Sequence, residues 1–309
     1  MKRNYNEIMI YTITTNPSLD YYMSFKDAIE QGNYFRSINE FYGAGGKGVN
    51  VSIFLSALGM ASSALGFLGG FTKEKYVDSL NRYPDIQPLF TTIKEDTRIN
   101  VKVMSSEETS FNAKGPNITD DEFEKFSNRL TNVYDSDIVV LSGNVQDELK
   151  DRIVETIGKL IENGTKVILD TSEDVVERCL DFKPYLVRVN ERVTSLSEDL
   201  ILVNSNLLLE KGAQNVCYSS SISSNYYFMN KEVCYKATRS ENANVGIGFN
   251  DSFIAGILYG IVRGANTKEL LQLGVSSSLK LNLAVNYSEH INISSMFEEI
   301  EVQEIWLRK

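Results

Sequence analysis

Two glycine-containing segments, about two hundred residues apart, carry the side chains best suited to chemistry in this chain of 309 residues. Segment 43–50 reads GAGGKGVN, and segment 248–252 reads GFNDS. Each opens a helix-like apolar pattern, and a helix N-terminus presents unpaired N–H groups and a partial positive charge that attract anions. The first segment contributes Lys47 and the second Asp251. Two anion sites, one with a candidate base, suggest phosphoryl transfer between two phosphorylated small molecules.

The first segment matches known phosphate-binding patterns only in part. Residues 43–48 fit G-x-G-x-x-G, but a dinucleotide site needs an acidic residue about twenty positions later, where the chain has the glycine-rich 66–70. A P-loop is excluded because Lys47 is followed by glycine rather than Ser or Thr. The remaining alternatives are a tight turn before a helix and a ligand-binding loop. Four glycines around one lysine favour the loop.

Asp251 has two interpretations, which carry about equal weight once the neighbouring Gly248 is considered, although the residue type alone favours the first. Aspartate is a common helix N-cap, which would make the position structural. Gly248, three residues earlier, lets backbone N–H groups turn toward one point. An aspartate beside such a cluster of donors can accept a proton from an attacking hydroxyl.

A third group of polar side chains stands on a strand-like segment. Arg98, Asn100 and Lys102 are spaced two apart, so they point to one face of the strand. The face is either solvated or a phosphate clamp, with the arginine binding in bidentate fashion and the lysine acting as a point charge. Because the chain is acidic overall, two cations on one face give some support to the phosphate clamp.

The whole-chain composition excludes several classes of function. The formal charge is −10 and the pI about 4.9, which argues against nucleic acid or an anionic membrane surface as the partner. Three scattered cysteines give neither a disulfide framework nor a zinc pattern. The single histidine, His290, is expected on the surface, and its isolation argues against His-dependent triads. No secretory leader is expected, so the cytoplasm is the expected compartment.

Strand-like and helix-like segments alternate along the chain, which predicts an α/β fold of three layers with a mostly parallel central sheet. The expected strands are 8–14, 63–68, 138–143, 166–170, 185–190, 215–218 and 226–228, and the expected helices are 51–58, 73–80, 121–133, 149–163, 251–260 and 268–284. We expect a single domain over 8–309. Segments 20–42 and 95–113 break the alternation and predict a small antiparallel lid.

Taken together, these residues resemble the PfkB (ribokinase-like) sugar kinases, most closely the branch of 1-phosphofructokinase and tagatose-6-phosphate kinase. The resemblance covers about residues 8–305. It is carried by TTNPSLD at 14–20, GGKGVNVS at 45–52, TRINVK at 97–102, SG at 142–143 and DSFIAG at 251–256. It implies a ribokinase-like fold whose β-sheet lid often forms a homodimer. It also implies ATP with Mg²⁺ as phosphate donor and a phosphorylated ketohexose as acceptor.

The resemblance also implies a role for each matching residue. Asp251 corresponds to the catalytic base, and the backbone of Gly248, Phe249, Asn250 and Asp251 to the anion hole for the transferring phosphoryl group. The positions that hold the sugar and its existing phosphate correspond to Asp20, Gly45, Gly46, Lys47, Asn50, Arg98, Asn100 and Lys102. The nucleotide side corresponds to Asn190, Ser219 and Ser221. No residue is directly assigned to the metal.

The departures from the family pattern gather on the nucleotide side. The motif G-A-G-D reads GFND at 248–251, and the glutamate of K-P-N-x-x-E is replaced by Val193. Both glycines of S-x-G-x-x-G are serines in 219–224. A kinase for an unphosphorylated sugar or a nucleoside is disfavoured, because Arg98 and Lys102 would then lack an anion. Two other functions remain open. The first is a sugar-phosphate kinase with unusual nucleotide contacts. The second is a phosphosugar-binding protein with impaired or absent kinase activity.

Overall fold

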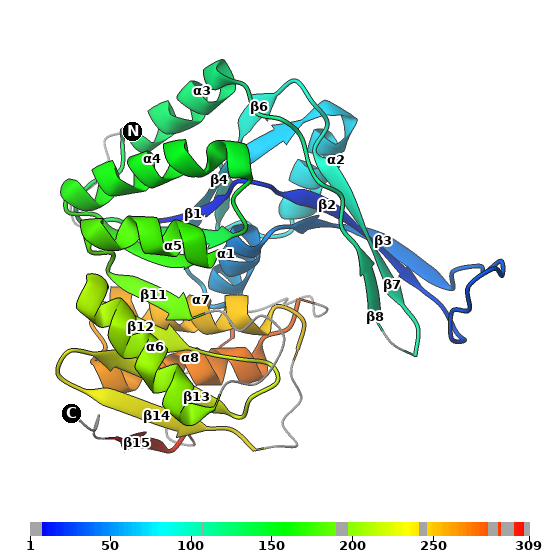
Figure 1. The fold of residues 1–309 in the computed structure, drawn as a ribbon. Coiled ribbons are helices and arrows are strands. Elements are labelled where there is room, and N and C mark those ends of the chain that lie inside the picture. The colour runs from blue at the N-terminus through cyan, green and yellow to red at the C-terminus, as the bar shows by residue number, and fades with distance from the viewer. Residues whose placement is uncertain are drawn as a thin grey trace.

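The computed structural model describes residues 8–106, 108–189, 197–240, 246–283, 290–291 and 300–305 (Figure 1). One sheet of eleven strands forms the centre, in the order β15-β14-β13-β12-β11-β10-β9-β1-β4-β5, with β6 paired to β4. The strands from β12 through β11, β10, β9, β1 and β4 to β5 are parallel, and β13, β14 and β15 are antiparallel additions. Their bounds are β1 Ile10–Thr14, β4 Ser62–Gly69, β5 Ile86–Pro88, β6 Thr91–Ile93, β9 Ile138–Gly143, β10 Lys166–Thr171, β11 Leu186–Val189, β12 Asn215–Tyr218, β13 Asn225–Asn230, β14 Cys234–Thr238 and β15 Val302–Glu304.

Helices cover both faces of this sheet, because its central strands are apolar on both sides. Within β9, Val139 and Leu141 pack toward the layer of α3 to α6, whereas Ile138 and Val140 pack toward α1, α7 and α8. Figure 1 shows the first layer in front and the second behind. The bounds are α1 Lys47–Ala57, α2 Gly70–Leu80, α3 Asp120–Leu130, α4 Lys150–Glu162, α5 Glu173–Cys179, α6 Glu198–Lys211, α7 Phe249–Val262 and α8 Thr267–Lys280, with 3₁₀ turns at Asp147–Leu149 and Leu180–Phe182.

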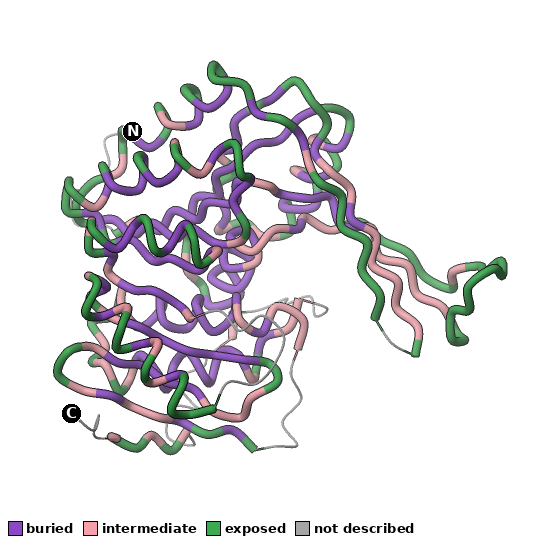
Figure 2. Tube along the Cα trace, in the orientation of Figure 1, coloured by how far each residue is buried: buried purple, intermediate pink, exposed green. Residues whose placement is uncertain are grey.

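A second sheet of four strands extends from the main body (Figure 1). Its order is β3-β2-β7-β8, with bounds β2 Ser18–Ser24, β3 Asn39–Gly45, β7 Arg98–Met104 and β8 Glu108–Phe111. The outer pairs are antiparallel, but the central pair of β2 and β7 is parallel. The expectation of a purely antiparallel lid was therefore wrong. The two central strands both run outward from the main body, and each returns through its own hairpin partner. Figure 2 shows that burial fades along this sheet away from the core.

The three-layer α/β fold expected from the sequence is confirmed. Helix α1 begins at Lys47, four residues before the apolar pattern that predicted it, and α8 ends at Lys280. The helices α5 and α6 were not predicted. His290 is exposed, as expected. Among the described residues, no helix combines the length and the apolar character needed to span a bilayer.

Candidate active site

The N-termini of α1 and α7 meet at the edge of the main sheet where its parallel strands end. The contact is direct, because Asn50 Nδ2 in α1 donates a hydrogen bond to Asp251 Oδ2 in α7 at 2.7 Å. Gly46 and Gly248 are the N-cap residues of the two helices, with φ of 128° and 80°. Both values lie where glycine is favoured. The two glycine segments identified in the sequence therefore form one site, at the edge where parallel α/β sheets bind ligands.

Asp251 occupies the third position of α7, and the cap is Gly248. The capping interpretation of Asp251 is therefore wrong, and the side chain is available to the site. It is only 5% exposed. Burial raises the pKa of Asp251 to about 7, because the loss of hydration and the nearby Asp170 carboxylate outweigh the opposing effects of Lys47, Asn50 and Arg188. A carboxylate with a pKa near neutrality is suited to accept a proton in the physiological range.

A buried ion pair lies beneath the site and was missed in the sequence. Arg188 in β11 donates from Nε to Asp170 Oδ1 in β10 at 2.7 Å, and its Nη2 lies 2.6 Å from the same oxygen. Both side chains are 0% exposed. Burial alone would lower the pKa of Arg188, but the Asp170 carboxylate outweighs it and raises that pKa. The available signal was a charged residue at the same end of two apolar strand patterns.

The proposed sugar side is organised around Asp20 in β2. Its Oδ1 accepts hydrogen bonds from Ser18 Oγ at 2.6 Å and from Asn100 Nδ2 at 3.0 Å. Burial raises the pKa of Asp20, against the effects of these bonds and of the Lys102 and Arg98 charges. A Cβ added at Gly45 would lie 2.5 Å from the Asp20 carboxylate. The two motif segments at 14–20 and 45–52 are thus in contact, and only glycine fits between them.

Arg98 and Lys102 share one face of β7 with Asn100, as expected. Arg98 donates from Nη1 to the Ala113 carbonyl and from Nη2 to the Asn16 carbonyl, both at 2.9 Å. Burial lowers the pKa of Arg98, although the Asp20 charge opposes the shift. Lys102 Nζ donates to Ser110 Oγ at 3.1 Å. The guanidinium is therefore fixed by two carbonyls, whereas the ammonium is held by one hydroxyl.

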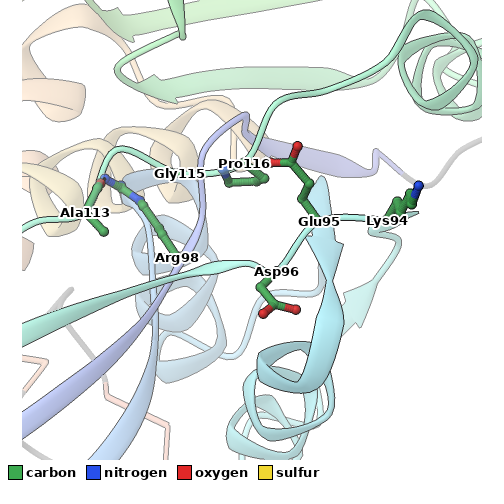
Figure 3. A pocket seen from close by; sticks show the side chains of 7 residues that line it. All are labelled: Lys94, Glu95, Asp96, Arg98, Ala113, Gly115 and Pro116. Carbon is green, nitrogen blue, oxygen red and sulfur yellow. The ribbon is translucent and has the colours of Figure 1, made fainter.

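Arg98 also borders a hollow of about 510 Å³ between the second sheet and the main body. Figure 3 shows its side chain reaching toward the loop of Ala113. The lining is Lys94, Glu95, Asp96, Arg98, Ala113, Gly115 and Pro116. The hollow carries charges of both signs, so it is not a simple anion site.

The candidate nucleotide side is connected to α7 through Ser219. Ser219 Oγ donates to Asn250 Oδ1 at 2.9 Å, and the Ser219 carbonyl accepts from Arg188 Nη1 at 3.4 Å. The Ser221 carbonyl accepts from Arg239 Nη2 at 2.8 Å, and the Arg239 guanidinium lies 5.9 Å from the centre of the Phe249 ring. Asn190 and Val193, which the sequence also singled out, lie outside the described residues.

The described part of the chain contains no group of three His, Cys, Asp or Glu side chains arranged to hold a metal ion. The three cysteines are free and buried.

Comparison with known proteins identifies the family. The model of the pfkB family carbohydrate kinases matches residues 15–281. The chain belongs to this family. The pfkB match includes both glycine segments, the strand of Arg98 and the buried pair of Asp170 and Arg188.

Individual relatives of this pfkB chain agree with the family. A 1-phosphofructokinase of Borreliella burgdorferi is 34% identical over 96% of this chain and 99% of its own length. A tagatose-6-phosphate kinase of Staphylococcus epidermidis is 28% identical over 96% of this chain and its full length. The crystal structure of Escherichia coli phosphofructokinase-2 with fructose-6-phosphate has the same fold, with a TM-score of 0.84 at 21% identity, covering 95% of this chain and 99% of that one.

Proposed function

We propose that the protein transfers the γ-phosphoryl group of ATP to a free hydroxyl of a phosphorylated ketohexose, of the fructose 1-phosphate or tagatose 6-phosphate type. One observation carries the proposal. The buried carboxylate of Asp251 lies where the two helix N-termini meet, and Asn50 of the opposite helix holds it at 2.7 Å. The names of the relatives, 1-phosphofructokinase and tagatose-6-phosphate kinase, support the class of acceptor.

Asp251 acts as the general base in this proposal. Its ionised carboxylate takes the proton of the acceptor hydroxyl while that oxygen forms a bond to the γ-phosphorus. The bond from the γ-phosphorus to the bridging oxygen breaks, and ADP leaves with the electron pair. Asn50 orients the carboxylate through the hydrogen bond to Oδ2. The Lys47 charge favours the ionised form of Asp251 and can offset the negative charge of the phosphates.

The sugar is bound by the surface around Asp20. The Asp20 carboxylate, held by Ser18 and Asn100, has a second oxygen, Oδ2, that can accept from sugar hydroxyls. Gly45 and Gly46 bind the sugar through their backbone, and their missing Cβ atoms leave room for the Asp20 and Thr14 side chains. Arg98 and Lys102 hold the phosphate that the sugar already carries. Lys102 exchanges its hydrogen bond with Ser110 for one with this phosphate. Arg98 donates to the phosphate from the N–H groups that do not bind the Ala113 and Asn16 carbonyls.

The nucleotide binds on the side of Ser219, Ser221 and Asn190. The backbone N–H groups of Phe249 and Asn250, at the start of α7, form the anion hole for the transferred group. The Gly248 cap suits this role, because it has no side chain that could occupy the N–H groups at the start of the helix. Magnesium ion would enter with the nucleotide and would screen the charge of the ATP phosphates, since the described residues include no group of three acidic, His or Cys side chains that would hold it.

The second sheet is proposed to act as a lid and as the contact of a homodimer. Its outer strands β3 and β8 have open edges, which a partner sheet can cover. Several large apolar side chains of the sheet and of the connection between β2 and β3 are exposed: Tyr34, Ile38, Phe41, Tyr42 and Phe111. Sedimentation velocity should show a dimer that dissociates in Phe41→Glu. A monomeric wild type would contradict this part of the proposal.

The experiment that tests the function is ADP release from MgATP with a panel of acceptors. The panel contains fructose 1-phosphate, fructose 6-phosphate, tagatose 6-phosphate and the free hexoses. We expect turnover with one phosphosugar and none in Asp251→Asn. Equal turnover in that variant would refute the mechanism. If no sugar supports ADP release but a phosphosugar raises the melting temperature, the protein is a phosphosugar-binding protein instead.

A further inference from the structure

The Asn250 side chain is oriented by a buried hydroxyl. Ser219, only 1% exposed, donates from Oγ to Asn250 Oδ1 at 2.9 Å. The carboxamide oxygen of Asn250 is therefore occupied. Its Nδ2 group makes no hydrogen bond to any residue within the described ranges. Two N–H donors are thus left at the second position of α7, beside the backbone donors of the helix end.

Ser219 is itself connected to the buried ion pair. Arg188 Nη1 donates to the Ser219 carbonyl at 3.4 Å, while Arg188 Nε binds Asp170 at 2.7 Å. Asp170 also accepts from Ser142 Oγ at 3.3 Å. The planar guanidinium can donate to the Asp170 carboxylate and to the Ser219 carbonyl at the same time. A lysine ammonium has no such fixed arrangement of donors. A continuous chain of polar contacts therefore runs from the ends of β9, β10 and β11 through Ser219 to Asn250.

The neighbouring base explains why a neutral donor suits this position. Asp251 follows Asn250 in α7 and needs a pKa near neutrality to accept a proton. A lysine or arginine at position 250 would bind a phosphoryl group more strongly, but its charge would lower the pKa of the adjacent carboxylate. An amide donates hydrogen bonds without that effect.

We propose that Asn250 Nδ2 donates a hydrogen bond to the phosphoryl group in transfer, and that Ser219 positions the amide for this. The inference rests on the proposed kinase function and deepens it. The side chain adds a donor to the backbone anion hole at a position where the family motif has glycine. The serine at 219 and the asparagine at 250 then form one functional unit.

Kinetics of three single variants test the proposal. Removing one oxyanion donor from an enzyme lowers kcat by about 10²–10³-fold. Because Asn250 is only partly buried, we expect a fall of about 10–100-fold in Asn250→Ala and Asn250→Gly, with the KM for the sugar nearly unchanged. Ser219→Ala should show a smaller fall. The matched control is Asn206→Ala, at an exposed position of α6, which should behave as wild type.

The double variant separates positioning from general loss of structure. If Ser219 acts only by orienting Asn250, then Ser219→Ala in the Asn250→Ala background should cause no further loss of kcat. Losses that multiply in the double variant would overturn the positioning role. Retention of wild-type kcat in Asn250→Gly would overturn the donor role, because the backbone alone would then suffice.

A binding measurement distinguishes failure of this inference from failure of the proposed function. Calorimetry would compare ADP alone with ADP plus aluminium fluoride, a mimic of the phosphoryl group in transfer. We expect Asn250→Ala to weaken the binding of ADP plus aluminium fluoride about tenfold and to leave the binding of ADP alone unchanged. Unchanged fluoroaluminate binding would refute the role of Asn250, whether or not the wild type turns over a sugar. Absence of wild-type turnover with every sugar, by contrast, would refute the proposed kinase function.

Discussion

The buried carboxylate of Asp251 should destabilise the folded protein at high pH. A variant without this carboxylate should therefore lose the pH dependence. Burial raises the pKa of Asp251 to about 7 from an ordinary value of 3.8. The folded state therefore binds this proton more tightly than the unfolded chain does. The stability that this contributes is fully present below pH 3.8 and is lost as the pH rises through about 7.

The size of the effect follows from the two pKa values. At about 1.36 kcal/mol per unit, the difference of roughly 3 units corresponds to a loss of about 4 kcal/mol by pH 9. About 2 kcal/mol of this is already lost at pH 5.5, where the unfolded carboxyl is ionised and the folded one is not. Asp251→Asn carries no charge at either pH. The free energy of unfolding of the variant minus that of wild type should therefore be about 2 kcal/mol larger at pH 9 than at pH 5.5, which means that the variant gains stability relative to wild type.

Urea denaturation of both proteins at the two pH values measures this difference. Asp27→Asn, at an exposed position of the second sheet's long connection, is the control and should show no such dependence on pH. A difference between Asp251→Asn and wild type that stays constant from pH 5.5 to pH 9 would refute the claim that burial perturbs this carboxyl.

Three further predictions follow from the same geometry. The value of kcat/KM should fall about tenfold per pH unit below pH 7, since the base must be ionised and the pKa of Asp251 is about 7. A pH profile that stays flat down to pH 5.5 would contradict the role of Asp251 as the base. Gly45→Ala should raise the KM for the sugar at least about tenfold, because the added Cβ lies 2.5 Å from the Asp20 carboxylate; steady-state kinetics would show this, and an unchanged KM would mean that Asp20 does not bind the sugar. Arg188→Met should lower the free energy of unfolding by about 3–5 kcal/mol by leaving Asp170 unpaired in the core; urea denaturation would measure this, and a loss below about 1 kcal/mol would show that the pair is hydrated.

The part of the site carried by local motifs could be predicted from the sequence. The glycines at 46 and 248 mark helix starts through conformations that other residues avoid, and Asp251 could be placed near one of them by spacing alone. The central strands were also predictable, since parallel strands buried on both faces are short apolar runs.

Contacts that depend on strand register could not be predicted. Asp170 and Arg188 pair because β10 and β11 align Leu169 with Val187, and nothing local in either strand specifies that alignment. The parallel pairing of β2 with β7 depends likewise on how distant segments meet. Helix α6 was missed because leucines and valines also stand on its exposed face, including Leu200, Val203 and Leu207.

The central claim is that the buried Asp251 site transfers a phosphoryl group to a sugar that is already phosphorylated. The most direct test is to incubate the protein with Mg²⁺, ATP labelled in its γ-phosphate and either fructose 1-phosphate or tagatose 6-phosphate, and to separate the products. We predict a labelled sugar bisphosphate that does not form with Asp251→Asn. Label that appears only in inorganic phosphate, or equally in the product of Asp251→Asn, would contradict the account.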